Sequence, residues 1–114
     1  MVRVVSDKFL QENLVPSAAT ETTMYTVPAA TTAILKSLRV TNANAGSSNI
    51  TIIQNDNGTT TDLYLYKEQA LVANATVDIF GGVPVVLESG DKLNVLSSVA
   101  TVHFYLSYME VDRN

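Results

Sequence analysis

Residues 87–95 read Leu-Glu-Ser-Gly-Asp-Lys-Leu-Asn-Val, which is a strand–turn–strand signal. An apolar run ends at the first leucine, and Leu93 and Val95 begin the next run with period-two alternation. Between them, Gly90 can take the positive φ of a tight reversal, and Asp91 can accept a hydrogen bond from nearby backbone. Serine, aspartate and lysine could also build a catalytic loop, but the one histidine of the chain lies on another predicted strand. We therefore interpret this stretch as a turn between two strands.

Alternation of apolar and polar residues continues on both sides of this turn. Valine and threonine are frequent, and their branched β-carbons suit a pleated strand. Turn residues recur about every ten positions, a spacing typical of short antiparallel strands. A single helical turn at residues 67–70 competes only weakly, because threonines that favour extension precede it. Eight strands are predicted, at about residues 24–27, 33–42, 50–52, 63–66, 75–79, 83–87, 93–95 and 102–107.

The same alternation predicts which side chains form the core. We expect Leu38 and Val40 to face inward on one strand, and Val102, Phe104 and Leu106 on another. Eight short strands leave no room for helical crossovers, so they should pair antiparallel. The expected fold is all-β: a single antiparallel β-sandwich, jelly-roll-like, with about eight strands.

The beginning of the chain lacks this pattern. Residues 1–17 mix polar and apolar side chains without a strand bounded by turns, whereas all eight predicted strands follow. We therefore expect an N-terminal leader or arm at residues 1–17 and a β-sandwich domain at residues 18–114. An arm of this kind could lie across a neighbouring subunit, with Phe9 and Leu10 as its apolar contact residues.

Composition argues against several classes of partner. The 114 residues are 46% hydrophobic and 16% charged, which is typical of a folded domain. The net charge is −4 and no basic run exists, so we expect no nucleic-acid binding. The cations Lys36 and Arg39 are an odd number of positions apart and should lie on opposite faces of a strand. We expect no membrane partner and no signal peptide, because no apolar run of the required length occurs.

Candidates for chemistry are few. The chain has no cysteine, and its single histidine, His103, cannot make the usual zinc site alone. No Gly-x-Ser-x-Gly elbow presents a nucleophilic serine to that histidine. Asn55, Asp56, Asn57 and Asp62 concentrate oxygen ligands that could attract calcium, but EF-hand spacing is absent, and Asn57-Gly58 is a strong hairpin signal. We expect no catalytic residue, no metal and no cofactor.

Exposed tyrosines are the main candidates for an interaction site. Tyr64 and Tyr66 should share one strand face, opposite the neighbouring leucines, and Tyr105 should point outward beside His103. Tyrosine is amphipathic and frequent in protein interfaces, and it can also stack on sugar rings. Tyrosines on a sheet also often only cover its surface, so the role of the pair stays open between an interface, a glycan site and packing.

Three segments resemble small structural proteins of tailed bacteriophages. Residues 19–42 read ATETTMYTVPAATTAILKSLRVTN, residues 71–76 read LVANAT, and residues 87–95 supply the turn described above. The resemblance covers most of the chain from residue 19 onward. It indicates the class of virion accessory proteins more than a position in the virion.

The resemblance implies a non-enzymatic virion structural protein assembled in a bacterial cytoplasm. Such β-sandwich proteins serve as capsid decoration or cement proteins, or as neck, tail and fibre attachments, commonly as oligomers. The implied partners are a major capsid or other virion protein and further copies of the chain, with a trimer as the expected ring. A glycan-binding module that recognises a receptor is the alternative from another class, although the absence of tryptophan weakens it.

Overall fold

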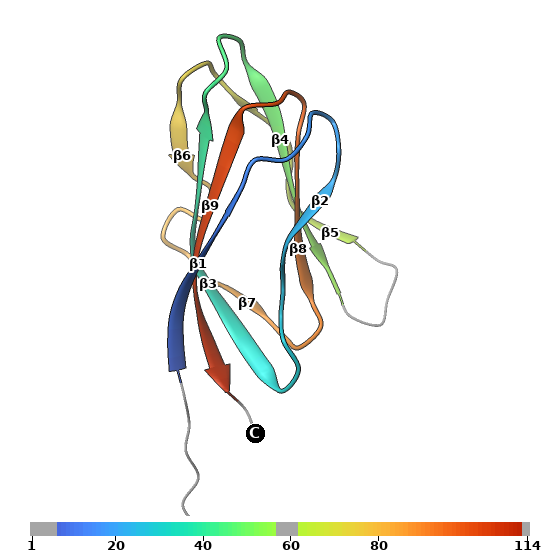
Figure 1. The fold of residues 1–114 in the computed structure, drawn as a ribbon, viewed down its shortest axis with the longest axis vertical. Coiled ribbons are helices and arrows are strands. Elements are labelled where there is room, and N and C mark those ends of the chain that lie inside the picture. The colour runs from blue at the N-terminus through green and yellow to red at the C-terminus, as the bar shows by residue number, and fades with distance from the viewer. Residues whose placement is uncertain (1–6, 57–61, 113–114) are drawn as a thin grey trace, which may run out of the picture.

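Nine strands form two antiparallel sheets that pack face to face in the computed structural model, which describes residues 7–56 and 62–112 (Figure 1). Sheet A has the order β1-β9-β3-β6, with β7 also paired to β3, and sheet B has the order β2-β8-β4-β5. The strands are β1 (Asp7–Leu14), β2 (Thr22–Thr26), β3 (Thr31–Asn42), β4 (Ser48–Asn55), β5 (Asp62–Leu71), β6 (Thr76–Asp78), β7 (Val85–Leu87), β8 (Lys92–Ser97) and β9 (Val102–Asp112).

Strands from the beginning of the chain pair with strands from its end. β1 pairs with β9, β2 with β8, β3 with both β6 and β7, and β4 with β5, so the first half of the chain pairs with the second half in reverse. This double layer of antiparallel strands is a jelly roll. The predicted sandwich is confirmed, and the strand that the sequence did not predict is β1.

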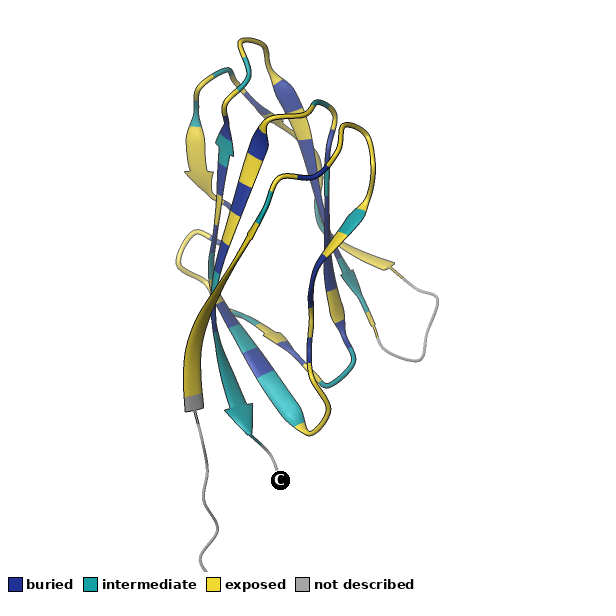
Figure 2. Ribbon diagram, viewed as in Figure 1, coloured by how far each residue is buried: buried dark blue, intermediate teal, exposed yellow. Residues whose placement is uncertain are grey.

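The core lies between the sheets and is built by alternation. Leu38, Val40, Val102 and Leu106 have no exposed surface, and Phe104 is 1% exposed, so the inward residues predicted for β3 and β9 are confirmed. Figure 2 shows buried and exposed residues taking turns along the upper part of β9. Sheet B contributes further side chains to the same apolar cluster, chiefly Ile50, Ile52, Leu93 and Val95.

A β-bulge in β3 changes which residues share a face. Leu35 pairs with Tyr108 but Ser37 pairs with Ser107, so Lys36 is an extra residue in β3. The inward set therefore shifts from odd to even numbers, with Leu35 buried before the bulge and Leu38 after it. Lys36 and Arg39 are both exposed and both lie on the outer face of sheet A. The prediction of opposite faces was wrong, because it assumed an unbroken alternation.

The turn at residues 87–95 has the predicted role. Gly90 has a φ of 85°, and its N–H donates to the carbonyl of Val27 at 3.0 Å. The buried Asp91 side chain accepts the N–H of Glu88 at 3.0 Å, closing the turn. The Ser89 hydroxyl donates to the carbonyl of Thr31 at 2.8 Å, and its oxygen accepts the Thr31 N–H at 3.0 Å. This serine therefore joins two turns at one end of the sandwich.

Part of the expected leader belongs to the sandwich. β1 lies within residues 1–17 and pairs with β9 over eight residue pairs, from Asp7↔Val111 to Leu14↔Phe104. The expected boundary between residues 17 and 18 thus falls after the first strand of sheet A. Residues 8–13 are all exposed, so β1 is held by its backbone ladder more than by buried side chains (Figure 2). This also explains why alternation did not reveal the strand.

β5 is a strand from Asp62 to Leu71, and the helical turn weighed for residues 67–70 does not form. Glu68 has a φ of 51° and donates its N–H to the Thr51 side-chain oxygen at 3.0 Å, which fixes a local irregularity in the ladder. Asn55 pairs with Asp62 at the ends of β4 and β5. The predicted hairpin turn at residues 57–58 lies outside the described residues.

Candidate interaction surface

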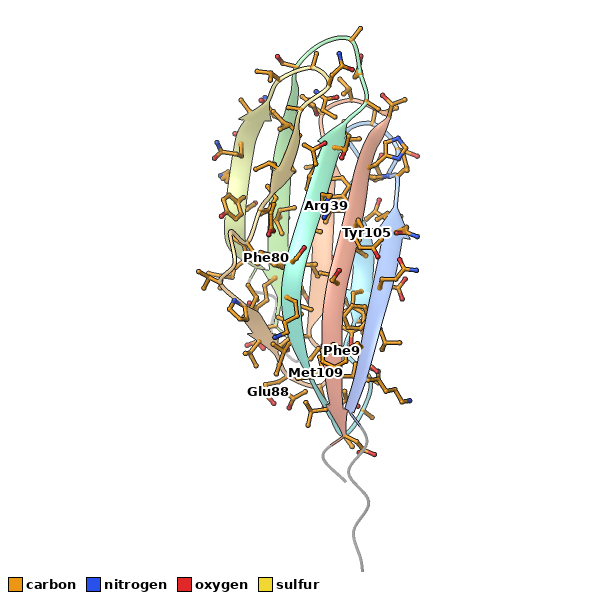
Figure 3. The ribbon with its side chains drawn as sticks, turned by 90° about the vertical axis from the view of Figure 1, so that its left-hand side faces the viewer. Phe9, Arg39, Phe80, Glu88, Tyr105 and Met109 are labelled. Atoms are coloured by element: carbon orange, nitrogen blue, oxygen red, sulfur yellow. The ribbon has the colours of Figure 1, made fainter. Side chains whose placement is uncertain are left out.

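The outer face of sheet A carries an apolar row that crosses four strands. Val86 pairs with Ile34, Ile34 with Met109, and Met109 with Phe9, so these four side chains lie side by side from β7 to β1. Phe9 is 75% exposed and Val86 is 55% exposed, while the two central residues are half-buried. Figure 3 shows Phe9 and Met109 next to each other on this face. We call these four residues the apolar row.

The next pairs along the strands are polar. Ser37, Ser107 and Gln11 form a neighbouring row, and the row after it contains Arg39 and Tyr105. A hollow of about 310 Å³ opens here. It is lined by Phe9, Leu10, Gln11, Lys36, Tyr105, Ser107 and Tyr108. The strand register places Phe9 and Tyr105 at levels on either side of the level of Gln11 and Ser107, and Lys36 also lines the hollow.

Three of the six predicted interface residues share this face. His103 and Tyr105 are exposed and alternate with the buried residues of β9. Phe9 is exposed and pairs with Met109, which faces outward, so all three side chains point away from the core. Leu10 has the opposite orientation, since it pairs with the buried Tyr108, but it is still 37% exposed at the rim. Phe9 and Tyr105 both line the hollow, whereas His103 lies six residues along β9 from Met109, the partner of Phe9.

Tyr64 and Tyr66 do not form the exposed pair that was expected. Tyr64 pairs with Ile53 and Tyr66 with Ile52, so Leu65 is an extra residue and the two rings face opposite ways. Tyr66 packs against the core, and its hydroxyl donates to the carbonyl of Ile79. Tyr64 is 49% exposed on sheet B, with the Lys67 ammonium 4.8 Å from its ring centroid. The expectation of a shared face was wrong for the same reason as in β3.

Two tyrosine–glutamate hydrogen bonds lie at the edge between the two sheets. The Tyr25 hydroxyl donates to Glu110 at 2.5 Å, and the Tyr108 hydroxyl donates to Glu12 at 3.3 Å. Burial, followed by the charge of Glu12, raises the pKa of Tyr108 to about 12, and burial together with the Glu110 hydrogen bond raises the pKa of Tyr25 further. Both tyrosines are therefore neutral donors at ordinary pH. This arrangement suits a structural link rather than acid–base chemistry, which needs a group that titrates near the working pH.

The candidates for catalysis are not brought together. His103 is exposed on sheet A, whereas Ser89 is bonded to Thr31 at the end of the sandwich. Among residues 7–56 and 62–112, no group of three or more histidine, aspartate or glutamate side chains could hold a metal ion. The same residues contain no helix long and apolar enough to span a membrane.

The sequence reasoning missed four residues of this surface: Ile34, Lys36, Val86 and Met109. Val86 lay within a predicted strand, and its position between two inward valine and leucine neighbours indicated an outward apolar side chain. Ile34 also lay within a predicted strand, whereas Met109 lies beyond residue 107, the predicted end of the strand that became β9. Lys36 could not be placed, because its position depends on the bulge.

Comparisons with known proteins are informative about the fold. No protein-family model matches the chain, and no curated protein matches it. A solved structure of Bacillus endospore appendages, described as disulfide-linked pili, aligns with a TM-score of 0.59 and 10% identity, covering 96% of this chain and 89% of that one. At this identity the likeness shows a shared β-sandwich fold.

Two viral structures align more distantly. The T13 particle of infectious bursal disease virus (IBDV) gives a TM-score of 0.48 with 9% identity, covering 94% of this chain and 35% of that one. The Gx strain of infectious bursal disease virus gives 0.47 with 13% identity, covering 98% and 34%. This chain therefore spans about a third of the length of those viral chains.

Proposed function

We propose that this chain is a non-enzymatic structural protein of a bacteriophage virion, and specifically a decoration or cement protein that bridges capsid subunits. The observation that carries the proposal is the apolar row on the outside of a sandwich whose own core is already filled. Exposed apolar groups that adjoin on one face are typical of an interaction surface, whereas single exposed apolar residues are not. The phage resemblance of residues 19–42, 71–76 and 87–95 supplies the setting.

Covering the row supplies the driving force for binding. Apolar surface removed from water contributes roughly 25 cal/mol per Å², so a partner that covers Phe9 and Val86 stabilises the complex by a few kcal/mol from these two residues. A protein that binds only the assembled shell stabilises that shell by mass action. No catalytic step is required for this role.

The pilus subunits offer an example of a related sandwich within an assembly, described as linked by disulfides. This chain contains no cysteine, so disulfides cannot link its copies, and we propose non-covalent contacts instead. A non-covalent assembly depends on apolar area and polar complementarity, and these are the features that the outer face of sheet A offers.

The N-terminal segment is the second part of the proposed contact. β1 pairs with β9 along one edge only, and its side chains from Lys8 to Asn13 are exposed. We propose that residues 1–17 contribute to the contact with a neighbouring virion subunit, as an arm or as a docked edge strand. Removing residues 1–15 should then weaken binding to the particle, and unchanged binding would rule this part out.

One observation favours a second candidate function, a glycan-binding module that recognises a receptor. The hollow beside Phe9 and Tyr105 combines aromatic rings with Gln11 and Lys36, and such groups can stack on a sugar ring and hydrogen-bond its hydroxyls. A neck, tail or fibre attachment would use the same surface against a different virion protein. Binding to a glycan array would support the receptor role, and an array without hits would argue against it.

Co-sedimentation with capsid shells tests the main proposal. Shells that lack the protein are mixed with the wild-type chain, with Phe9→Asp and with Tyr64→Asp, which places the same charge at an exposed aromatic position on sheet B. The wild type and Tyr64→Asp should pellet with the shells, and Phe9→Asp should lose most of its binding. Equal binding by all three proteins, or no binding by the wild type, would contradict the proposal.

A further inference from the structure

We propose that the outer face of sheet A binds a second copy of the same chain, face to face, about a twofold axis that runs along the apolar row. The inference rests on the proposed structural role and assigns the apolar row to the contact between two copies. In the dimer, the shell contact then falls to the N-terminal segment of each copy, and Phe9→Asp loses shell binding because it loses the dimer. The dimer replaces the expected trimer as the first assembly step.

The strand register makes this face self-complementary. The apolar row crosses sheet A at one level, from Val86 through Ile34 and Met109 to Phe9. When a second copy is placed on the first with the twofold axis along this row, each row covers the other. The level of Ser37 and Ser107 in each copy then meets the level of Thr32 and Val111 in the other. A surface that matches itself in this way forms an isologous, closed dimer, whereas a trimer needs two different complementary patches.

Charge on this face has opposite signs on the two sides of the row. Lys36 lies beyond Ile34 toward the middle of β3, and Arg39 follows on the same outer face. Glu88 follows β7 on the other side, next to Leu87, which pairs with Ala33. Figure 3 shows Arg39 above and Glu88 below the level of Phe9 and Met109. The twofold axis therefore turns the acidic side of each copy toward the basic side of the other.

Lys36 is the cation that most directly meets this acidic side. Arg39 lies farther from the row than Lys36 and pairs in register with Asp78, an acid on the same sheet. The Asp78 carboxylate itself accepts the N–H groups of Leu38 and Phe80. Lys36 occupies its place only because of the bulge, which gives this irregularity a role in recognition. Two symmetry-related Lys36–Glu88 pairs across the dimer follow from the geometry.

The area of this face corresponds to a small interface. The strands that carry the row, β3, β9, β1 and β7, have 12, 11, 8 and 3 residues. At about 3.3 Å per residue and 4.8 Å between strands they present on the order of 550 Å², compared with roughly 800 Å² per partner in a standard interface. Two sheets packed in this way are about 10 Å apart, the spacing found within sandwiches. The half-buried Ile34 and Met109 then become the centre of the interface, and the exposed Phe9 and Val86 become its ends.

Single-cysteine cross-linking tests the arrangement, since the chain has no cysteine of its own. Met109→Cys and Phe9→Cys are treated with a short bis-maleimide, with Tyr64→Cys on sheet B as the matched control. The inference expects linked dimers from Met109→Cys and Phe9→Cys and monomers from Tyr64→Cys. Monomers from both sheet A variants, or a linked dimer from Tyr64→Cys in equal yield, would overturn it.

A charge swap tests the recognition itself. Lys36→Glu and Glu88→Lys should each raise the dimer dissociation constant about tenfold, and the double variant should restore most of the affinity. Additive losses in the double variant, or a trimer in sedimentation equilibrium, would overturn the twofold geometry. A monomeric chain that still binds shells overturns the dimer alone, whereas a dimer that binds no shell overturns the decoration role alone.

Discussion

Tyr25 of β2 and Tyr108 of β9 come from opposite sheets, and their ring centroids lie 4.4 Å apart with the planes tilted by 46°. Each hydroxyl donates to a carboxylate from sheet A, Tyr25 to Glu110 at 2.5 Å and Tyr108 to Glu12 at 3.3 Å. The pair therefore joins the two sheets next to β1, whose residues 8–13 are exposed. Stacked aromatic rings contribute about 0.5–1.5 kcal/mol beyond their burial.

Replacing Tyr25 with phenylalanine should keep the ring contact but remove the donor to Glu110. A hydrogen bond to a charged group contributes roughly 1.5–3 kcal/mol, so the free energy of unfolding should fall by about that amount. Urea unfolding monitored by circular dichroism measures it. Tyr105→Phe, at an exposed ring on β9, is the control and should change stability by less than about 0.5 kcal/mol. Equal effects of the two substitutions would show that the inter-sheet hydrogen bond adds nothing.

The raised tyrosine pKa values predict a loss of stability at high pH. Burial raises the pKa of Tyr108 from 10.0 to about 12, so the folded state keeps its proton while the unfolded state begins to lose it near pH 10. The contribution is fully present below pH 10 and is lost as the pH rises toward 12. Urea midpoints measured on either side of pH 10 should show this decline, and Tyr108→Phe should decline less. A profile that is identical in the wild type and the variant would contradict the assignment.

Tyr66 and Tyr64 should respond differently to loss of the hydroxyl. Tyr66→Phe removes the donor to the Ile79 carbonyl and should lower the free energy of unfolding by about 1 kcal/mol. Tyr64→Phe alters a half-exposed ring on sheet B and should leave stability unchanged within about 0.5 kcal/mol. Thermal unfolding of both variants checks this. Equal destabilisation would mean that the two rings have similar surroundings, and this result would contradict the bulge at Leu65.

The bulge in β3 predicts which deletion the chain tolerates. Removing Lys36 leaves Leu35 and Leu38 inward, because the remaining residues then alternate regularly. A shift of one residue exchanges the two faces of a strand. Removing Arg39 should therefore turn Val40 and the residues that follow it to the outer face. The first deletion should give a folded protein with a cooperative urea transition, and the second should give an unfolded or insoluble one. Two proteins of equal stability would contradict the assigned register.

Much of the fold was predictable from alternation. β3 and β9 are long central strands with one buried face, so Leu38, Val40, Phe104 and Leu106 follow the rule that a half-buried strand alternates. The turn at residues 87–95 was predictable for a local reason, because Gly90 and Asp91 provide its geometry themselves. The order of the strands in the two sheets comes from long-range pairing.

The parts that the sequence did not predict have common physical causes. β1 is exposed on both faces, so it shows no alternation, and its pairing with β9 comes from the tertiary fold. The extra residues Lys36 and Leu65 reverse the inward side of β3 and β5, and nothing local marks them. For this reason Tyr66 was expected outside and Lys36 was expected opposite Arg39. The apolar row depends on the register of four strands, so it could not be predicted from the linear sequence.

Hydroxyl-radical footprinting compares the assembled and the dilute protein and tests most directly whether the outer face of sheet A is the contact surface. Phe9, Met109 and Tyr64 have side chains that react with hydroxyl radicals. Phe9 and Met109 belong to the apolar row, and Tyr64 lies on sheet B. Oxidation of Phe9 and Met109 should fall several-fold on assembly, while oxidation of Tyr64 stays unchanged. Unchanged oxidation of Phe9 and Met109 together with protection of Tyr64 would contradict the proposed surface.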